Sequence, residues 1–409
     1  MLSDSVVEGP PPFTRLWAEI VGVGRDAGSG GYLRYGFGGA VRELERWFRG
    51  VATADGAHTV EADGNGNLFA WYGPPPERGD AVLLGSHFDS VPHGGGYDGP
   101  LGIVSALLAV RMLRESGREF RRPVGVVAFA EEEGSRFGVP CLGSRLLSGA
   151  LDPDRAAGLV DRDGTTLAEA MGRRPAGARP ELLSRIGVFV ELHIEQGRAL
   201  VDLAAPVGIA SGIWPHGRWL LDFAGEANHA GTTRMADRRD PMLTYAFTVL
   251  AANKEARLRG AHATIGRVEV EPNATNAIPA RVRGWLDARA ADAATLEALV
   301  EAVRAKAADR AVRDGTTLDL VRESLSPPVE FDGGLVTAFR RVLADGVPVL
   351  PTAAGHDAGI LAAHVPTAML FVRNPTGVSH SPAESASDDD CAEGVRRLAD
   401  LLTELAAAG

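Results

Sequence analysis

The sequence predicts an α/β protein whose discontinuous, mostly parallel sheet is interrupted by a smaller inserted α+β domain. The chain has 409 residues, which is too long for one ordinary core. Short apolar runs alternate with helical patterns early in the chain and again at its end, while the middle has a different order of elements. We therefore expect one domain formed by residues 1–206 and 328–409, and a second formed by residues 207–327.

The elements of the first domain follow from their hydrophobic patterns. Glycine and proline punctuate the first 75 residues around one helical pattern near residues 39–51. Apolar runs typical of buried parallel strands then occur at residues 81–85, 124–130 and 188–192. A helical pattern at 102–116 separates the first two runs, as a strand–helix–strand crossover requires.

The middle of the chain has its own order of elements. Strand patterns occur at 218–223, 264–270, 282–287 and 317–321, and helical patterns at 241–258 and 291–313. This β-α-β-β-α-β order is that of the ferredoxin-like unit, which closes its own small sheet and can be inserted in another domain. From residue 331 the first pattern resumes, with a strand at 367–372 and an amphipathic helix at 391–408.

Composition excludes several classes of protein. Hydrophobic residues make up 45% of the chain and charged residues 23%, which excludes long intrinsic disorder. The net charge of −11 argues against nucleic acid as a partner. We expect a cytoplasmic protein without membrane segments, because apolar runs are short and the start lacks a signal-peptide pattern. Cys141 and Cys391 are the only cysteines, so any metal must be held by His, Asp and Glu.

Ionisable side chains follow four of the expected strands. In chain order they are His87, Asp89 and Asp98 after the first strand, Glu132 and Glu133 after the second, His193 at the end of the third, and His380 after the strand at 367–372. Taken alone, each of these motifs more often has a structural explanation. His87 and Asp89 could be a hydrogen-bonded pair, the glutamates a solvated surface, His193 a core histidine, and the segment around His380 a turn. Ligands bind at the carboxyl ends of parallel strands, and converging charges are costly unless they pair or bind a metal. Their coincidence therefore predicts a metal site.

Five of these side chains offer imidazole nitrogen or carboxylate oxygen, a donor set that suits Zn, Mn, Co or Ni. They are His87, Asp98, Glu133, His193 and His380. Five ligands, one of them a carboxylate that can bridge, suit two divalent ions. We expect Asp89 to accept the second N–H of a ligand imidazole and so fix its orientation. Glu132 adjoins a ligand but points elsewhere on an alternating backbone, which suits a general base for water.

With these residues in place, the sequence closely resembles the M20 family of metallopeptidases and amidases. The match is to the branch that contains allantoate amidohydrolases, N-carbamoyl-L-amino-acid hydrolases and β-ureidopropionases. The stretches that carry it are GSHFDSVPHGGGYDGPLG (85–102), AEEEGSRFG (130–138), VELHIEQG (190–197), GEANHAGTTRMADRRD (225–240), EPNATNAIPARV (271–282), AGHDAG (354–359) and GVSHSPAE (377–384). They occur in order over most of the chain, and together they are highly specific.

The resemblance implies that the five ligands bind two metals with Asp98 bridging, and that Glu132 is the base. It also implies that the smaller domain is a lid that dimerises and closes over the site. His229, Asn276 and Arg289 match lid residues that contact substrate, often in the neighbouring subunit's site. Gln196 matches a substrate-contacting position in the catalytic domain.

The residues themselves support two of these roles. The guanidinium of Arg289 suits bidentate capture of a carboxylate, although an arginine at a strand end is usually just exposed. His229 lies in a turn, from which it could donate to an oxyanion or merely stabilise the turn. The sequence departs from many relatives at Arg234, a position where proline is common. Relatives also differ from one another in the residues around Arg373. The roles of Arg234, Arg373 and His356 stay open.

We therefore expect a metal-dependent amidohydrolase that cleaves the ureido group of a small amino-acid-like substrate and forms a homodimer. Residues 16–35 and 213–219 look most like allantoate amidohydrolases, so allantoate ranks first. N-carbamoyl-L-amino acids, or the substrate of a β-ureidopropionase, rank second. A dipeptidase or deacylase of the wider family shares the metal set. The alternative from a different class is a non-catalytic protein that binds small molecules. Such a protein would have no need of a general base such as Glu132 beside Glu133.

Overall fold

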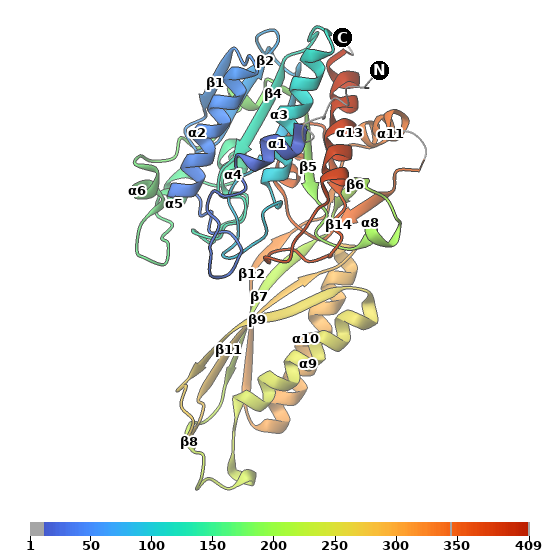
Figure 1. Cartoon of the computed structure of the whole chain (residues 1–409). Helices are drawn as coiled ribbons and strands as arrows, with labels where there is room; N and C mark the ends of the chain where they lie inside the picture. The colour runs from blue at the N-terminus through green and yellow to red at the C-terminus, as the bar shows by residue number, and fades with distance from the viewer. Residues whose placement is uncertain (1–11, 344–345, 408–409) are drawn as a thin grey trace, which may run out of the picture. The chain divides into compact units, whose positions relative to one another are not determined.

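The computed structural model describes residues 12–343 and 346–407 (Figure 1). It divides into a large unit, Met1–Gly212 with Glu330–Gly409, and a small unit, Ile213–Val329. The sequence pattern predicts the first boundary at residue 207, six residues earlier. The difference arises because strand β6 (Val207–Ile213) pairs with β15 (Thr367–Val372) in the sheet of the large unit. Residue 408, the end of the expected last helix, lies outside the described residues.

The large unit is built on a nine-stranded mixed sheet. Its order is β1-β2-β4-β3-β5-β15-β6-β13, with β14 paired to β6. The other strands are β1 (Thr59–Ala62), β2 (Leu68–Tyr72), β3 (Ala81–His87), β4 (Val124–Phe129), β5 (Ile186–Ile194), β13 (Val329–Glu330) and β14 (Val349–Thr352). The four central strands β4, β3, β5 and β15 are parallel, and antiparallel neighbours flank them. The large α/β sheet is confirmed.

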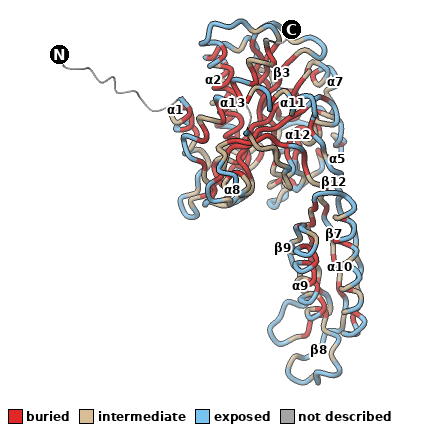
Figure 2. Tube along the Cα trace, turned by 90° about the vertical axis from the view of Figure 1, so that its right-hand side faces the viewer, coloured by how far each residue is buried: buried red, intermediate tan, exposed pale blue. Residues whose placement is uncertain are grey.

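Helices pack on this sheet, and strand and helix side chains together form the hydrophobic core of the large unit. Helix α3 (Pro100–Glu115) is buried over most of its surface, and α13 (Asp388–Ala407) packs against it. Buried residues gather at the centre of the large unit (Figure 2). The remaining helices are α1 (Pro12–Ala18), α2 (Gly39–Ala54), α4 (Leu142–Ser148), α5 (Pro153–Ala157), α6 (Leu167–Met171), α7 (Pro180–Leu183), α8 (Ala199–Asp202), α11 (Gly333–Val342) and α12 (Asp357–Leu361). Every helix within residues 12–343 and 346–407 is too short or too polar to span a bilayer.

The small unit has the β-α-β-β-α-β order that its hydrophobic pattern predicts. Its elements are β7 (His216–Ala224), α9 (Pro241–Arg259), β9 (His262–Glu271), β11 (Arg281–Arg289), α10 (Ala293–Asp314) and β12 (Thr317–Ser326). The strands form an antiparallel sheet in the order β12-β7-β11-β9. Burial alternates along β11 because one face of the sheet packs on the two helices while the other is partly exposed. A short ladder of β8 (Asn228–His229) and β10 (Ala277–Ile278), and a 3₁₀ turn (Met235–Asp237), complete the unit.

Candidate metal centre and active site

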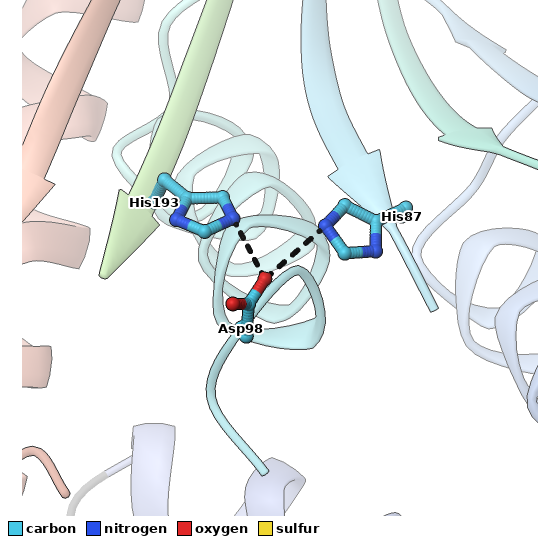
Figure 3. A group of neighbouring side chains, drawn as sticks. All are labelled: His87, Asp98 and His193. Carbon is cyan, nitrogen blue, oxygen red and sulfur yellow. Dashed lines mark ion pairs between the residues drawn. The ribbon is translucent and has the colours of Figure 1, made fainter. Parts of the chain in front are cut away.

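The carboxyl ends of the central parallel strands bring the expected ligands together. His87 is the last residue of β3, His193 lies near the end of β5, and Glu133 follows β4. Because β4, β3 and β5 are parallel neighbours, these ends lie at one edge of the sheet. Asp98 comes from the glycine-rich loop just before α3, and Figure 3 shows its carboxylate between the two imidazoles.

Asp98 is shared by two groups of side chains. Its Oδ1 lies 3.5 Å from Nε2 of His87 and 3.2 Å from Nε2 of His193 (Figure 3). Its Oδ2 lies 3.5 Å from Nε2 of His380, which is also 3.4 Å from Oε2 of Glu133. The five side chains thus form two three-residue groups, each compact enough to hold one ion, with Asp98 common to both.

The chemistry of the two buried imidazoles fits a divalent cation. Nδ1 of His87 lies 3.0 Å from the carbonyl oxygen of Asp89, and Nδ1 of His193 lies 2.9 Å from that of Ile194. A carbonyl can only accept, so each Nδ1 carries the hydrogen, and each Nε2 presents a lone pair when the ring is neutral, the form that binds a metal. Both Nε2 atoms are buried without a hydrogen-bond partner among the described residues. A cation between them and Asp98 would satisfy these costly lone pairs.

The charges at this edge favour a cation as well. Burial alone would lower the pKa of His193, but the carboxylate of Asp98 raises it to about 9. Burial raises the pKa of Glu133 well above its usual range, and the charges of Asp98 and Glu132 raise it further. Carboxylates that crowd into a buried space therefore call for positive charge, which a proton on His193 or a bound cation can supply.

Asp89 acts differently from our expectation. Its carboxylate lies 3.7 Å from Nδ1 of His87, and the hydrogen-bond acceptor is its backbone carbonyl instead. The carboxylate accepts the backbone N–H groups of Glu132 at 3.1 Å and of Glu133 at 3.0 Å. The chain turns after β3 so that the carbonyl faces the imidazole. The Asp89 side chain therefore holds the turn that follows β4.

Glu132 lies beside the expected ligands without joining either group. Its Oε2 is 3.7 Å from Nε2 of His87, and its Oε1 accepts the thiol of Cys141 at 3.3 Å. Burial raises the pKa of Glu132 to about 7, with His87 opposing and Asp89 reinforcing the shift. A carboxylate that titrates near neutrality is suited to accept and return a proton.

The small unit brings two of its three expected substrate contacts together. β8 and β10 pair, and the N–H of Ala230 donates to the carbonyl of Asn276 at 3.0 Å, so His229 and Asn276 lie side by side. Arg289 ends β11, whose start lies near this ladder. Arg289 is eight residues from Arg281, the first residue of β11. At a rise of about 3.3 Å per residue, the two ends of the strand are about 26 Å apart. Its guanidinium donates to the carboxylate of Asp287 at 2.8 and 3.2 Å.

Two arginines with open roles have local partners. Arg234 donates to Asp237 at 2.6 Å on the surface of the small unit. Arg373 donates to the buried carboxylate of Asp390 at 3.0 and 2.8 Å, which ties the end of β15 to α13. Arg373 therefore has a structural role.

The family model of "Peptidase family M20/M25/M40" matches residues 83–404. The chain belongs to the M20 peptidase family. It is 36% identical to an N-carbamoyl-L-amino acid amidohydrolase of Geobacillus stearothermophilus over 405 residues, 96% of this chain and 98% of that protein. It is 34% identical to an allantoate amidohydrolase of Escherichia coli (strain K12) over 390 residues, 92% of this chain and 94% of the other.

Solved structures agree with this M20 assignment. A hydantoinase/carbamoylase family amidase from Burkholderia vietnamiensis superposes with a TM-score of 0.85 at 31% identity, covering 96% of this chain and 97% of that one. The resemblance seen in the sequence is confirmed. This M20 protein is a hydrolase that acts on C–N bonds, and its clustered His, Asp and Glu side chains are consistent with a dinuclear metal site.

The sequence leaves open the roles of two groups, His356 and Asp357, that are buried beside the M20 site. The ring of His356 lies 4.5 Å from that of His193, and its Nε2 is buried without a hydrogen-bond partner in the described part of the chain. Burial and the positive charge of His193 hold the pKa of His356 well below its usual range. Asp357 accepts the hydroxyl of Ser144 at 2.5 Å. The sequence signal for these two residues was the AGHDAG stretch (354–359). The spacing of residues along the chain does not reveal that this stretch contacts β5.

Glu384 ties together two loops that carry expected ligands. Its Oε1 accepts the N–H groups of Tyr97 at 2.9 Å and Asp98 at 3.0 Å, and its Oε2 lies 3.4 Å from the hydroxyl of Ser379. The carboxylate therefore links the Asp98 loop to the His380 loop. Its place four residues after His380 was the only signal in the sequence.

Gln196, expected to contact substrate, donates to Oδ2 of Asp98 at 2.6 Å. The side chain thus borders the shared carboxylate, and its contact with substrate stays a prediction.

Proposed function

We propose that this M20 hydrolase cleaves the ureido C–N bond of allantoate, using two divalent cations held by His87, Asp98, Glu133, His193 and His380. The observation that carries the proposal is the position of Asp98, one oxygen of which faces His87 and His193 and the other His380. When bound, the cations would polarise the ureido carbonyl and lower the pKa of a neighbouring water. The donor set accepts Zn, Mn, Co or Ni.

Glu132 would move the protons of the reaction. Its carboxylate takes a proton from the attacking water and returns it to the leaving nitrogen, which breaks one C–N bond of the ureido group. The carbamic acid that remains decomposes to carbon dioxide and the second nitrogen compound, so that ammonia, carbon dioxide and the substrate amine are the products. The thiol of Cys141 and the Asp89-bound backbone hold this carboxylate in place. His229 would donate to the oxyanion of the tetrahedral intermediate.

The other substrate contacts would come from Gln196, Asn276 and Arg289. Arg289 would hold the substrate carboxylate through paired N–H groups. Because β11, about 26 Å long, lies between Arg289 and the end of the strand that is near the His229 ladder, one small molecule cannot contact both side chains of the same chain. A second copy would therefore supply His229 and Asn276.

Surface chemistry of the small unit supports a homodimer through this unit, which we propose acts as the lid. Helix α9 exposes an apolar stripe, and β9, which packs beside α9, is an edge strand with an exposed Val268. The stripe consists of Leu243, Phe247, Leu250 and Leu258. An exposed apolar face beside an unpaired strand edge is typical of a surface that another chain covers.

N-carbamoyl-L-amino acids are the second candidate substrates, because the relative with 36% identity is an N-carbamoyl-L-amino acid amidohydrolase. Both candidates present a ureido group and a carboxylate to the same catalytic residues. The distinction between them lies in the substrate side chain.

A substrate panel tests the proposal. Purified protein, loaded in turn with each of the four metals, is assayed for ammonia release from allantoate and an N-carbamoyl-L-amino acid, and for cleavage of a dipeptide. We expect the highest kcat/KM with allantoate, and for Glu132→Gln a kcat that is about 10²- to 10⁴-fold lower than that of the wild type. A preference for the carbamoyl amino acid would select the second candidate. Dipeptide cleavage alone, or ligand binding without turnover, would contradict a ureido hydrolase.

A further inference from the structure

The imidazole of His229 is held by its own loop. The backbone N–H of Gly231 donates to Nδ1 at 3.0 Å, and the N–H of Thr232 donates to the same atom at 3.2 Å. An Nδ1 that accepts two hydrogen bonds carries no hydrogen. The neutral ring therefore has its N–H at Nε2, the nitrogen that faces away from the loop backbone.

Arg238 closes this loop from the other side. Its Nη2 donates to the carbonyl of Ala230 at 2.7 Å, and its Nε and Nη2 donate to the carbonyl of Thr233 at 3.2 and 3.1 Å. These two carbonyls flank the pair of N–H groups that contact His229. The N–H and hydroxyl of Thr233 also donate to the carbonyl of His229, at 3.1 and 2.7 Å.

We propose that Arg238 is a positioning residue of the reaction. By bridging the carbonyls of Ala230 and Thr233, it keeps the intervening N–H groups against Nδ1 and so selects Nε2–H as the donor that His229 offers to the substrate. The inference rests on the oxyanion-stabilising role proposed for His229. His229 is exposed, so packing does not fix its ring and the loop hydrogen bonds must do so.

The fork of an arginine suits this task, since two carbonyls are reached by one rigid planar group. Arg234 provides a natural contrast in the same loop. It is also an arginine, but its side chain is 82% exposed and pairs with Asp237 rather than with the loop carbonyls. Removing Arg234 therefore removes a nearby charge without opening the loop around His229.

Nitrogen NMR of the full-length protein labelled with ¹⁵N-histidine tests the geometry directly. The His229 signals are assigned by their loss in His229→Gln. We expect wild type and Arg234→Ala to show a single tautomer with the hydrogen on Nε2, and Arg238→Ala to show a mixture of tautomers. A hydrogen on Nδ1 in the wild type would overturn the proposal, and this result needs no variant to fold. An unchanged tautomer in Arg238→Ala would overturn it too.

Kinetics then separate this inference from the function on which it rests. We expect Arg238→Ala to lower kcat about tenfold, comparable to the loss of one or two hydrogen bonds, with a smaller change in KM and unchanged metal content. Arg238→Lys should restore part of kcat, and Arg234→Ala should match the wild type. If the tautomer shifts in Arg238→Ala while both it and His229→Gln keep full kcat, the proposed role of His229 is wrong and the loop geometry stands. A kcat loss without a tautomer shift would contradict the positioning role alone.

Discussion

The large unit buries most of its candidate catalytic groups, with His380 as an exposed exception, whereas the small unit presents most of its candidates on exposed segments. His87 is fully buried and Asp98 is 3% exposed. His229 and Asn276 are exposed, and strands such as β9 and β12 are exposed along much of their length (Figure 2). In the large unit, desolvation sets the chemistry. In the small unit, local hydrogen bonds such as those to His229 must orient each side chain.

This difference determines what a substitution should do. A buried ionisable group that loses its partner leaves an uncompensated charge or lone pair, so the site as a whole is affected. An exposed group that is changed loses only its own contacts, because water replaces the missing partner.

The largest effect is expected for Asp98→Ala. Both groups of ligands lose their shared carboxylate, so we expect loss of bound metal and of measurable turnover, determined by elemental analysis and ammonia release. Asp222→Asn, which removes a carboxylate that pairs with Arg281 in the small unit, is the control and should retain both. Full metal content in Asp98→Ala would show that Asp98 does not bridge.

Glu132→Gln should separate metal binding from proton transfer. Because Glu132 belongs to neither ligand group, we expect metal content to stay at the wild-type level while kcat falls about 10²- to 10⁴-fold, the usual contribution of a general base. Near-normal kcat would remove Glu132 from its proposed role.

Glu384→Ala tests the link between the Asp98 and His380 loops. Loss of a group that orients metal ligands typically lowers metal affinity about 10- to 100-fold. Titration of the metal-loaded protein with a chelator should show this weakening, with the variant still folded by circular dichroism. Unchanged affinity would mean that the two loops keep their places without the carboxylate.

Arg289→Lys tests a residue of the small unit. A lysine keeps the charge but loses the paired N–H groups, so we expect KM to rise and kcat/KM to fall about tenfold at constant metal content. An unchanged KM for every ureido acid tested would exclude Arg289 from carboxylate binding.

The smallest effect is expected for the ion pair of Asp222 with Arg281 on the small unit. The hydrogen bond from Arg281 lowers the pKa of Asp222, so the pair stabilises the fold above the carboxyl's ordinary pKa of 3.8 and loses that contribution as the pH falls through the lowered value. Asp222→Asn should therefore lower Tm slightly at pH 7 and leave it unchanged at strongly acidic pH. A large loss of Tm at pH 7 would contradict this view of the exposed unit.

The sequence was sufficient to predict the expected ligand cluster because ionisable side chains seldom converge at the ends of buried parallel strands unless they pair or bind a ligand. His87, Glu133 and His193 each lie at or just beyond an apolar run that is typical of a buried strand. The β-α-β-β-α-β order of the small unit was equally clear, because its patterns are long and periodic.

Contacts across the fold could not be predicted in the same way. Spacing does not reveal that the backbone of Asp89, rather than its carboxylate, faces His87, since that depends on one turn of the chain. It also does not reveal that His356 lies against His193. The position of Arg289 at the opposite end of β11 from His229 became clear only when the strand register was known.

The most direct test of the account is a crystal structure of the metal-loaded protein with anomalous scattering recorded at the absorption edge of the bound metal. We expect two ions about 3.5–4 Å apart, one beside His87 and His193, the other beside Glu133 and His380, with Asp98 between them. A single ion at full occupancy, or two ions that Asp98 does not join, would contradict it.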